Sequence, residues 1–281
     1  MHQFRRGELI FDVRDAGPAD GPVVVLLHGF PQSNSSWDAV IDRLTAEGYR
    51  CLAPNQRGYS RGARPPRRRD YRTSELVDDV EALIDASGAQ RVHLVGHDWG
   101  ATVAWAVAAE LPSRLASVSP ISVPHPAAFV KAIVTSKQAL ASWYIALFQL
   151  PRIPERLLLR RNGVSSRLQT FLERGGLTPD AAARDAQAMA EPGALTAALN
   201  WYRAIPLSGG GRIGQKITVP TMYVWSDNDA ALLDKAAKAS GRYVSADYRF
   251  ETLGGVSHWI PEERPDTVAE LLLDWFRLHP A

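Results

Sequence analysis

The sequence lacks the features of secreted proteins, of membrane-spanning proteins and of proteins stabilised by structural zinc. Cys51 is its one cysteine, so no internal disulfide can form, and no group of cysteine and histidine has the spacing of zinc ligands. No apolar run reaches the roughly 18 to 20 residues that a membrane-spanning helix requires. The first residues, MHQFRRGELIFDV, also lack the apolar stretch of a secretory signal. We therefore expect a cytoplasmic protein with no structural metal, stabilised by burial of apolar side chains.

The net charge is small, but positive charge is concentrated in one loop. The formal net charge is +2, whereas residues 57–72 hold seven arginines and one acid, Asp70, so the rest of the chain carries −4. A basic segment can mark a nucleic-acid or anionic surface. A lone basic loop on an otherwise acidic chain is more often a solvated surface, so we expect neither a nucleic-acid nor a membrane partner.

What the sequence does contain is an alternation of strand and helix patterns. Five short apolar, β-branched segments predict strands buried on both faces. They are residues 23–29, 49–55, 91–98, 115–124 and 221–229. Helical periodicity separates the first four, at residues 36–47, 73–87 and 100–111. This order predicts an α/β fold, a mostly parallel twisted sheet flanked by helices, with ligands at the carboxyl ends of the strands.

The alternation is interrupted by a long helical segment. Residues 126–211 are rich in Ala, Leu and Arg and have helical periodicity. We predict a core made of residues 1–125 and 212–281 and an inserted helical cap at 126–211. The glycines at 209–214 match GxGxxG, but that signature needs a strand before it and a helix after it, so we interpret this stretch as a linker. The core pattern resumes with a predicted strand at 248–252 and a predicted helix at 264–278.

The strongest chemical signal follows the third predicted strand. Gly96 and Gly100 lie two residues on either side of Asp98, and a helical pattern begins at once. This spacing permits a tight strand-to-helix turn that projects the central residue above the sheet, as in a nucleophile elbow. Asp98 is therefore the predicted nucleophile.

An acid and a histidine follow in the order that a catalytic triad requires. Asp229 ends the strand pattern at 221–229, and His258 lies between the last strand and the last helix. Nucleophile, acid and histidine occur in this chain order in the α/β-hydrolase fold. We assign His258 as the base and Asp229 as the acid that orients its ring, with Asp227 as a competitor for the acid role.

The sequence HGFP after the first predicted strand supplies a third element. In this fold, one backbone N–H from this loop and the N–H after the nucleophile form an oxyanion hole. These groups are the backbone N–H groups of Phe30 and Trp99. The sequence leaves the isomer of the peptide bond before Pro31 open.

Together, HGFP, GHDWGA, SHW and the helical insertion resemble the epoxide hydrolase branch of the α/β-hydrolase superfamily over nearly the whole chain. Members of this family carry two ring-opening tyrosines on the cap. The segments SWYIALFQLP and NWYR are similar to those regions and place the tyrosines at Tyr144 and Tyr202. One departure from many relatives is Asn55, in APNQRGYS, where an aspartate is common.

The resemblance implies a reaction and a substrate class. Asp98 would form an ester with a small hydrophobic epoxide, the tyrosines would protonate the departing oxygen, and water activated by His258 would release a vicinal diol. No metal or other cofactor is implied. We expect Phe30, Trp99, Phe148 and Trp259 to contact the substrate, and the sequence leaves self-association open.

Two alternatives remain at this point. A haloalkane dehalogenase shares the aspartate and the histidine, but such enzymes commonly have HGNP, with a second halide donor where this chain has Phe30. Trp143 or Trp201 would have to replace that donor. A ligand receptor or pseudoenzyme on the same fold is the more remote alternative, because no member of the catalytic set is missing.

Overall fold

The centre of the molecule is an eight-stranded sheet with the order β1-β2-β4-β3-β5-β6-β9-β10. The computed structural model describes residues 1–163, 165–209 and 214–281. Six strands, from β4 to β10 across the sheet, pair in parallel. Their bounds are β3 Val23–Leu27, β4 Arg50–Pro54, β5 Val92–His97, β6 Leu115–Ile121, β9 Thr221–Ser226 and β10 Tyr248–Leu253. All six predicted strands are therefore present.

Two strands at the N-terminal edge were missed by the sequence analysis. β1 Gln3–Arg6 and β2 Leu9–Ala16 form an antiparallel hairpin, and β2 continues antiparallel to β4. In β1 and β2 only Phe4, Phe11 and Val13 are buried, because an edge hairpin has one covered face. This pattern is weaker than that of a strand buried on both faces.

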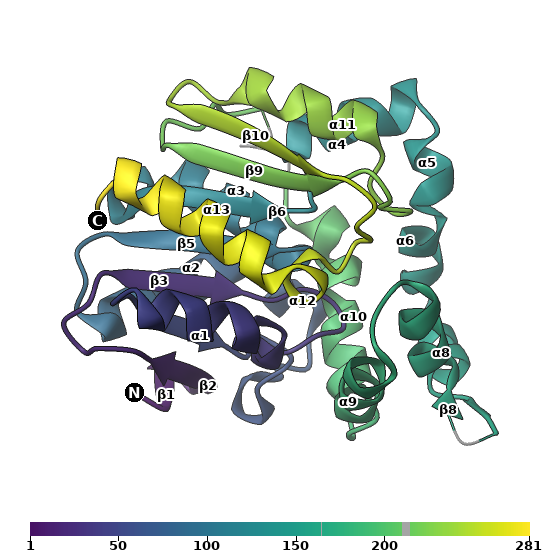
Figure 1. Ribbon diagram of the computed structural model, residues 1–281. Helices are drawn as coiled ribbons and strands as arrows, with labels where there is room; N and C mark the ends of the chain where they lie inside the picture. Colours follow the sequence, from purple (N-terminus) through teal and green to yellow (C-terminus); the bar gives the residue numbers. More distant parts are fainter. Residues whose placement is uncertain (164, 210–213) are drawn as a thin grey trace.

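Helices cover both faces of the sheet. Figure 1 shows α1 (Asp38–Ala46) and α13 (Pro265–Leu278) in front of the sheet, with α2 (Thr73–Ser87) and α3 (Trp99–Glu110) behind it. Alternate residues of β3 enter the two hydrophobic clusters: Val24 and Leu26 pack with α1 and α13, and Val25 and Leu27 pack with α2 and α3. The period of two along β3 thus divides one apolar run between two cores.

A helical segment lies between β6 and β9 along the chain. Figure 1 shows α10 and α6 beyond the carboxyl ends of the central strands. The helices on the two faces of the sheet do not cover this end, which carries the strand-to-helix turns. The bounds are α4 Pro126–Thr135, α5 Gln138–Ala141, α6 Trp143–Phe148, α7 Ile153–Leu158, β7 Arg161–Asn162, β8 Ser165–Ser166, α8 Arg167–Arg174, α9 Pro179–Met189 and α10 Ala194–Ala204. We call these elements the cap helices. The predicted boundary between residues 211 and 212 lies outside the described residues, as does part of the predicted glycine linker.

The chain returns to the sheet through β9, α11 (Asp234–Ala239), β10 and the short α12 (Ile260–Glu263). Within the described ranges, no helix combines the length and the apolar composition needed to cross a bilayer. The same part of the chain contains no group of three or more His, Cys, Asp or Glu side chains arranged to hold a metal ion.

Candidate active site

Asp98 occupies a strained turn between β5 and α3. Its φ is 52°, a left-handed value that costs a non-glycine residue on the order of 1 to 3 kcal/mol. The flanking glycines make the turn sterically possible. A Cβ at Gly96 would lie 2.2 Å from the Gly100 carbonyl oxygen, and one at Gly100 would lie 2.1 Å from the Leu27 carbonyl oxygen. The predicted elbow is therefore present, with the Asp98 side chain above the carboxyl end of β5.

Two groups hold the Asp98 carboxylate. The Phe30 N–H donates to Oδ1 at 2.8 Å, and Nε2 of His258 lies 3.4 Å from Oδ2. Burial alone would raise the pKa of Asp98, but the hydrogen bond and charge of His258 outweigh it and lower that pKa. Asp98 is therefore ionised and able to act as a nucleophile at neutral pH.

One of the two predicted oxyanion donors contacts this carboxylate. The Phe30 N–H, next to the cis peptide bond between Phe30 and Pro31, donates to Oδ1. Trp99 directly follows Asp98 and is the first residue of α3, so its backbone N–H has no acceptor within the helix. The Trp99 N–H is therefore available as the second donor.

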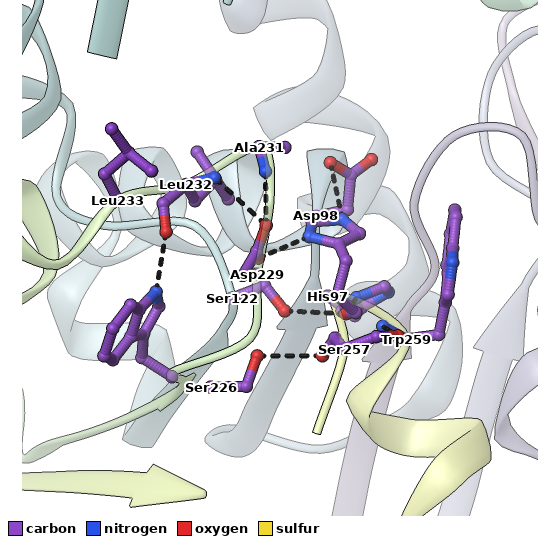
Figure 2. A network of polar contacts seen from close by, with 12 residues as sticks. His97, Asp98, Ser122, Ser226, Asp229, Ala231, Leu232, Leu233, Ser257 and Trp259 are labelled. Carbon is purple, nitrogen blue, oxygen red and sulfur yellow. Dashed lines mark hydrogen bonds and ion pairs between the residues drawn. The ribbon is translucent and has the colours of Figure 1, made fainter. Parts of the chain in front are cut away.

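Asp229, and not Asp227, is the acid that contacts the histidine. Nδ1 of His258 donates to Asp229 Oδ2 at 2.7 Å, whereas Asp227 accepts the Gly255 N–H. The other oxygen of Asp229 accepts the backbone N–H groups of Ala231 and Leu232, at 2.8 and 3.0 Å (Figure 2). With both oxygens occupied, the carboxylate is fixed and can hold the imidazole in one orientation.

The backbone around His258 is held by three buried side chains. His97 Nε2 and Ser122 Oγ both donate to the His258 carbonyl, at 2.8 and 3.0 Å. Ser226 Oγ donates to the Ser257 carbonyl at 2.8 Å (Figure 2). Burial lowers the pKa of His97 to about 4, so this second histidine stays neutral and acts as a donor. In the sequence, the indication of this supporting role is that His97 directly precedes Asp98 in GHDWGA.

His258 itself is shifted in the opposite direction. Burial disfavours the charged ring, but the carboxylates of Asp229 and Asp98 outweigh burial and raise the pKa of His258 to about 10. In this state the ring is an imidazolium between two carboxylates. The protonation of His258 therefore depends on the charge of Asp98.

The loop after β4 supports the oxyanion side of the site. The Gln56 N–H donates to His28 Nε2 at 3.1 Å, which leaves the proton of His28 on Nδ1, facing the Gly29 carbonyl. Burial lowers the pKa of His28 to about 4, so it is neutral. Asn55, the unusual residue of this loop, accepts the Asn34 N–H with its side-chain oxygen. An amide performs this acceptor role without a charge.

A cavity of about 460 Å³ extends from Asp98 between α3 and the cap helices. Its lining on α3 follows the helical period and consists of Trp99, Thr102, Trp105, Ala106, Ala109 and Glu110. Val123, Pro124, Phe129, Ile145 and Leu232 are among the apolar residues that complete the wall. Most of this wall was not predicted from the sequence, although residues at helical spacing after the elbow would have indicated those on α3. A cavity of this size and composition suits a small apolar ligand.

Tyr144 and Tyr202 line the same cavity as Asp98, from α6 and α10. Their ring centroids are 6.1 Å apart with the planes at 78°. Burial, followed by the negative charge of Asp98, raises the pKa of both phenols above its ordinary value. Both groups therefore remain protonated donors at physiological pH.

The four residues predicted to touch substrate occupy different positions. Among the described residues, the cavity wall includes Trp99 but not Phe30, Phe148 or Trp259. Phe30 and Phe148 pack against the Tyr202 ring, with centroids 5.4 and 4.9 Å away. Trp259 packs against the His258 ring at 5.1 Å. Phe30 and Phe148 thus support Tyr202, which lines the cavity, and Trp259 supports the predicted base.

Neither tryptophan considered as a halide donor is placed for that role. Nε1 of Trp201 donates to the Arg57 carbonyl at 2.8 Å, and the Trp143 side chain is 63% exposed on the outside of α6. The N–H of Phe30 is already bonded to Asp98. The geometry therefore does not favour the dehalogenase alternative.

The basic loop is also less solvated than predicted. Arg57 is 3% exposed and forms two hydrogen bonds of 2.7 Å with the buried carboxylate of Asp79. Arg61 and Arg64 pair with Glu191, between α9 and α10. The solvated-surface interpretation is therefore wrong for the buried Arg57 and the partly buried Arg64, whereas Arg61 is 79% exposed, as that interpretation predicts.

Comparisons with known proteins agree with this geometry. The family model described as "alpha/beta hydrolase fold" matches residues 22–265. The chain is 37% identical to "AB hydrolase superfamily protein YfhM" of Bacillus subtilis, covering 94% of this chain and 93% of that protein. It is 32% identical to "Epoxide hydrolase A" of Mycobacterium tuberculosis, covering 94% and 92%. A crystal structure of epoxide hydrolase A from Mycobacterium thermoresistibile superposes with a TM-score of 0.81 at 27% identity, over 98% and 97% of the two chains.

Proposed function

Because the chain belongs to the epoxide hydrolase family of the α/β-hydrolase superfamily, we propose that it opens an epoxide to a vicinal diol through a covalent ester on Asp98. The observation that carries this proposal is that Asp98, Tyr144 and Tyr202 line one cavity. A nucleophile and two proton donors facing the same space are what ring opening requires.

The choice of aspartate restricts the substrate. A carboxylate that attacks an ester would form a reactive anhydride, whereas attack on an sp³ carbon with a leaving group forms a stable ester. The Phe30 N–H engages Oδ1 of Asp98, so Oδ2 is the oxygen available for attack. Substrates are therefore expected to carry their leaving group on carbon, as an epoxide does.

In the first half-reaction, an oxygen of Asp98 bonds to a ring carbon as the carbon–oxygen bond of the ring breaks. The departing oxygen would be a poorly stabilised alkoxide without a proton. Tyr144 or Tyr202 supplies that proton, a contribution of about 10²- to 10⁴-fold for general-acid assistance, and the phenolate regains a proton from solvent. The products are an ester and a hydroxyl group on neighbouring carbons.

In the second half-reaction, water attacks the ester carbonyl while His258 takes its proton. Oδ1 of Asp98 becomes the oxyanion, beside the N–H groups of Phe30 and Trp99. As this intermediate collapses, the bond from the carbonyl carbon to the substrate oxygen breaks, and His258 returns its proton to that oxygen to complete the diol. The carboxylic acid of Asp98 then gives its proton to His258, which restores the carboxylate. Esterification removes the negative charge of Asp98, so the pKa of His258 falls in the intermediate, where a neutral base is needed.

The experiment that tests this proposal is a mass measurement on His258→Gln. This variant can form the ester but cannot activate water, so incubation with styrene oxide should add one substrate mass to the protein. Replacement of the exposed His2 by Gln is the matched control and should show no lasting adduct. Diol formation at the unaltered rate in His258→Gln, with no adduct, would refute the mechanism.

A further inference from the structure

The outermost cap helices expose an unusual number of large apolar side chains. We call residues 137–163 and 165–174, which contain α5, α6, α7, β7, β8 and α8, the outer layer. Figure 1 shows α5, α6, α8 and β8 along one edge of the molecule, with α10 between α6 and the sheet. Six large apolar side chains of this layer are 38 to 74% exposed: Leu140, Trp143, Leu150, Ile153, Leu157 and Phe171. Packing within the chain leaves this surface uncovered.

The outer layer is also strongly basic. It contains seven basic residues and two acidic ones, a net charge of +5, so the remainder of the chain carries −3. One of the two acids, Glu155, is paired with the buried Arg203. The basic residues are Lys137, Arg152, Arg156, Arg160, Arg161, Arg167 and Arg174, all exposed, and in the described part of the chain none of them pairs with a carboxylate.

Charge decides which partner fits this surface. A second copy of the chain, packed face to face about a two-fold axis, would bring +5 against +5 and leave the cations unpaired. A nucleic acid would neutralise the cations, but its phosphate backbone would not cover Trp143, Leu140 or Phe171. A partner must supply both negative charge and an apolar phase.

We propose that the outer layer docks on an anionic lipid surface. Apolar side chains would enter the boundary between headgroups and acyl chains, while lysine and arginine side chains reach the lipid phosphates. The expectation of no membrane partner rested on the basic loop and on the lack of a long apolar run, and neither feature describes a surface assembled from several short helices.

The placement of α6 relates this surface to the cavity. Trp143 is exposed on the outer side of α6, whereas Tyr144 and Ile145 line the cavity on its inner side. The width of a single helix thus separates the proposed lipid contact from the cavity wall. An apolar compound dissolved in the lipid would be concentrated beside the cap, whatever reaction follows.

Vesicle co-sedimentation of the full chain without substrate tests the docking directly, so its outcome does not depend on the proposed reaction. The protein should sediment with vesicles of phosphatidylcholine mixed with phosphatidylglycerol, and much less with phosphatidylcholine alone. Raising the salt concentration should release it, because part of the attraction is screened. Equal binding to both vesicle types, or no binding to either, would overturn the proposal.

Two pairs of matched variants separate charge from apolar contact. Arg156→Gln/Arg160→Gln/Arg161→Gln should weaken binding to anionic vesicles by about tenfold or more. The control Arg67→Gln/Arg68→Gln/Arg69→Gln removes the same charge from exposed arginines of the basic loop and should bind as the parent does. Equal loss in both triple variants would mean that net charge alone drives binding and would overturn the assignment to this surface.

The apolar pair tests the second requirement. Leu140→Ser/Phe171→Ser should also weaken binding, whereas Leu278→Ser, at an exposed leucine on α13, should not. Sedimentation velocity without lipid should show a monomer. A dimer that is lost in Leu140→Ser/Phe171→Ser would assign this surface to a second copy and overturn the proposal.

Discussion

Replacing Asp98 by asparagine should lower the pKa of His258 by several pH units. The asparagine side chain has the shape of the carboxylate and, like the proposed ester, carries no charge. His258 would then face one carboxylate, that of Asp229, in place of two. Asp98→Asn is therefore a stable analogue of the covalent intermediate for measuring the state of the base.

The magnitude follows from the separation of the two groups. Nε2 of His258 lies 3.4 Å from Oδ2 of Asp98. At an effective dielectric constant of about 20, two unit charges at that distance attract by about 5 kcal/mol. This energy corresponds to about 3.5 pH units. The pKa of His258, about 10 when both carboxylates are ionised, should therefore fall to about 6 to 7 in Asp98→Asn.

The sign of this change matters for catalysis. The imidazolium of the free enzyme cannot accept a proton at pH 7.5, whereas the same ring in the variant is mostly neutral and can. Formation of the ester would thus convert His258 into a base at the step that needs one. A general base with a pKa near the working pH is also the most effective kind.

Nuclear magnetic resonance titration of the histidine side chains is the assay. His258 is assigned by comparison with His258→Gln, and mass spectrometry verifies that residue 98 is still the amide. The control Asp227→Asn removes a carboxylate from the same region that contacts Gly255 and not His258, so it should leave the pKa unchanged. A pKa of His258 still above about 9 in Asp98→Asn would refute the electrostatic coupling.

Three further outcomes are expected. Asp229→Asn should slow ester hydrolysis by about 10³- to 10⁴-fold in rapid-quench mass spectrometry, whereas equal loss in Asp227→Asn would mean that the acid role is shared. Tyr202→Phe should slow ester formation from styrene oxide by about 10²-fold and leave ester hydrolysis nearly unchanged; an equal effect on both steps would argue against a proton-donor role. Arg57→Ala should lower the free energy of unfolding in urea by about 3 kcal/mol, because it leaves a buried carboxylate without its main partner. The exposed Arg69→Ala is its control, and similar losses in the two variants would contradict the buried pair.

The sequence predicted those parts of the fold in which the local residue pattern indicates the burial or the backbone conformation of the segment. Strand β3 is a run of five apolar residues, three of them valine, and such a short β-branched run favours a strand covered on both sides. The elbow was predictable because only glycine fits at residues 96 and 100. Hairpin β1–β2 was missed because three buried residues in twelve do not distinguish an edge strand from a loop.

The positions of the site residues relative to the cavity depend on packing that the sequence does not contain. Phe148 and Tyr202 are both buried aromatics on the cap helices, yet only Tyr202 lines the cavity, because the angles of α6 and α10 decide which ring faces α3. Arg57 lies in a loop and its partner Asp79 is 22 residues away on α2, so local composition could not reveal that Arg57 is buried. Asp229 and His258 could be identified from the sequence because each follows a predicted strand, in the order that the α/β-hydrolase fold requires. The choice between Asp229 and Asp227 needed the structure, which shows the contact of each carboxylate.

The left-handed turn at Asp98 also makes one residue serve two opposing requirements. At φ 52° the residue that relieves the backbone is glycine, which has no carboxylate. A change that removes the backbone strain of the elbow therefore removes the predicted nucleophile as well. Stability of this turn cannot be improved through residue 98 without loss of the proposed chemistry.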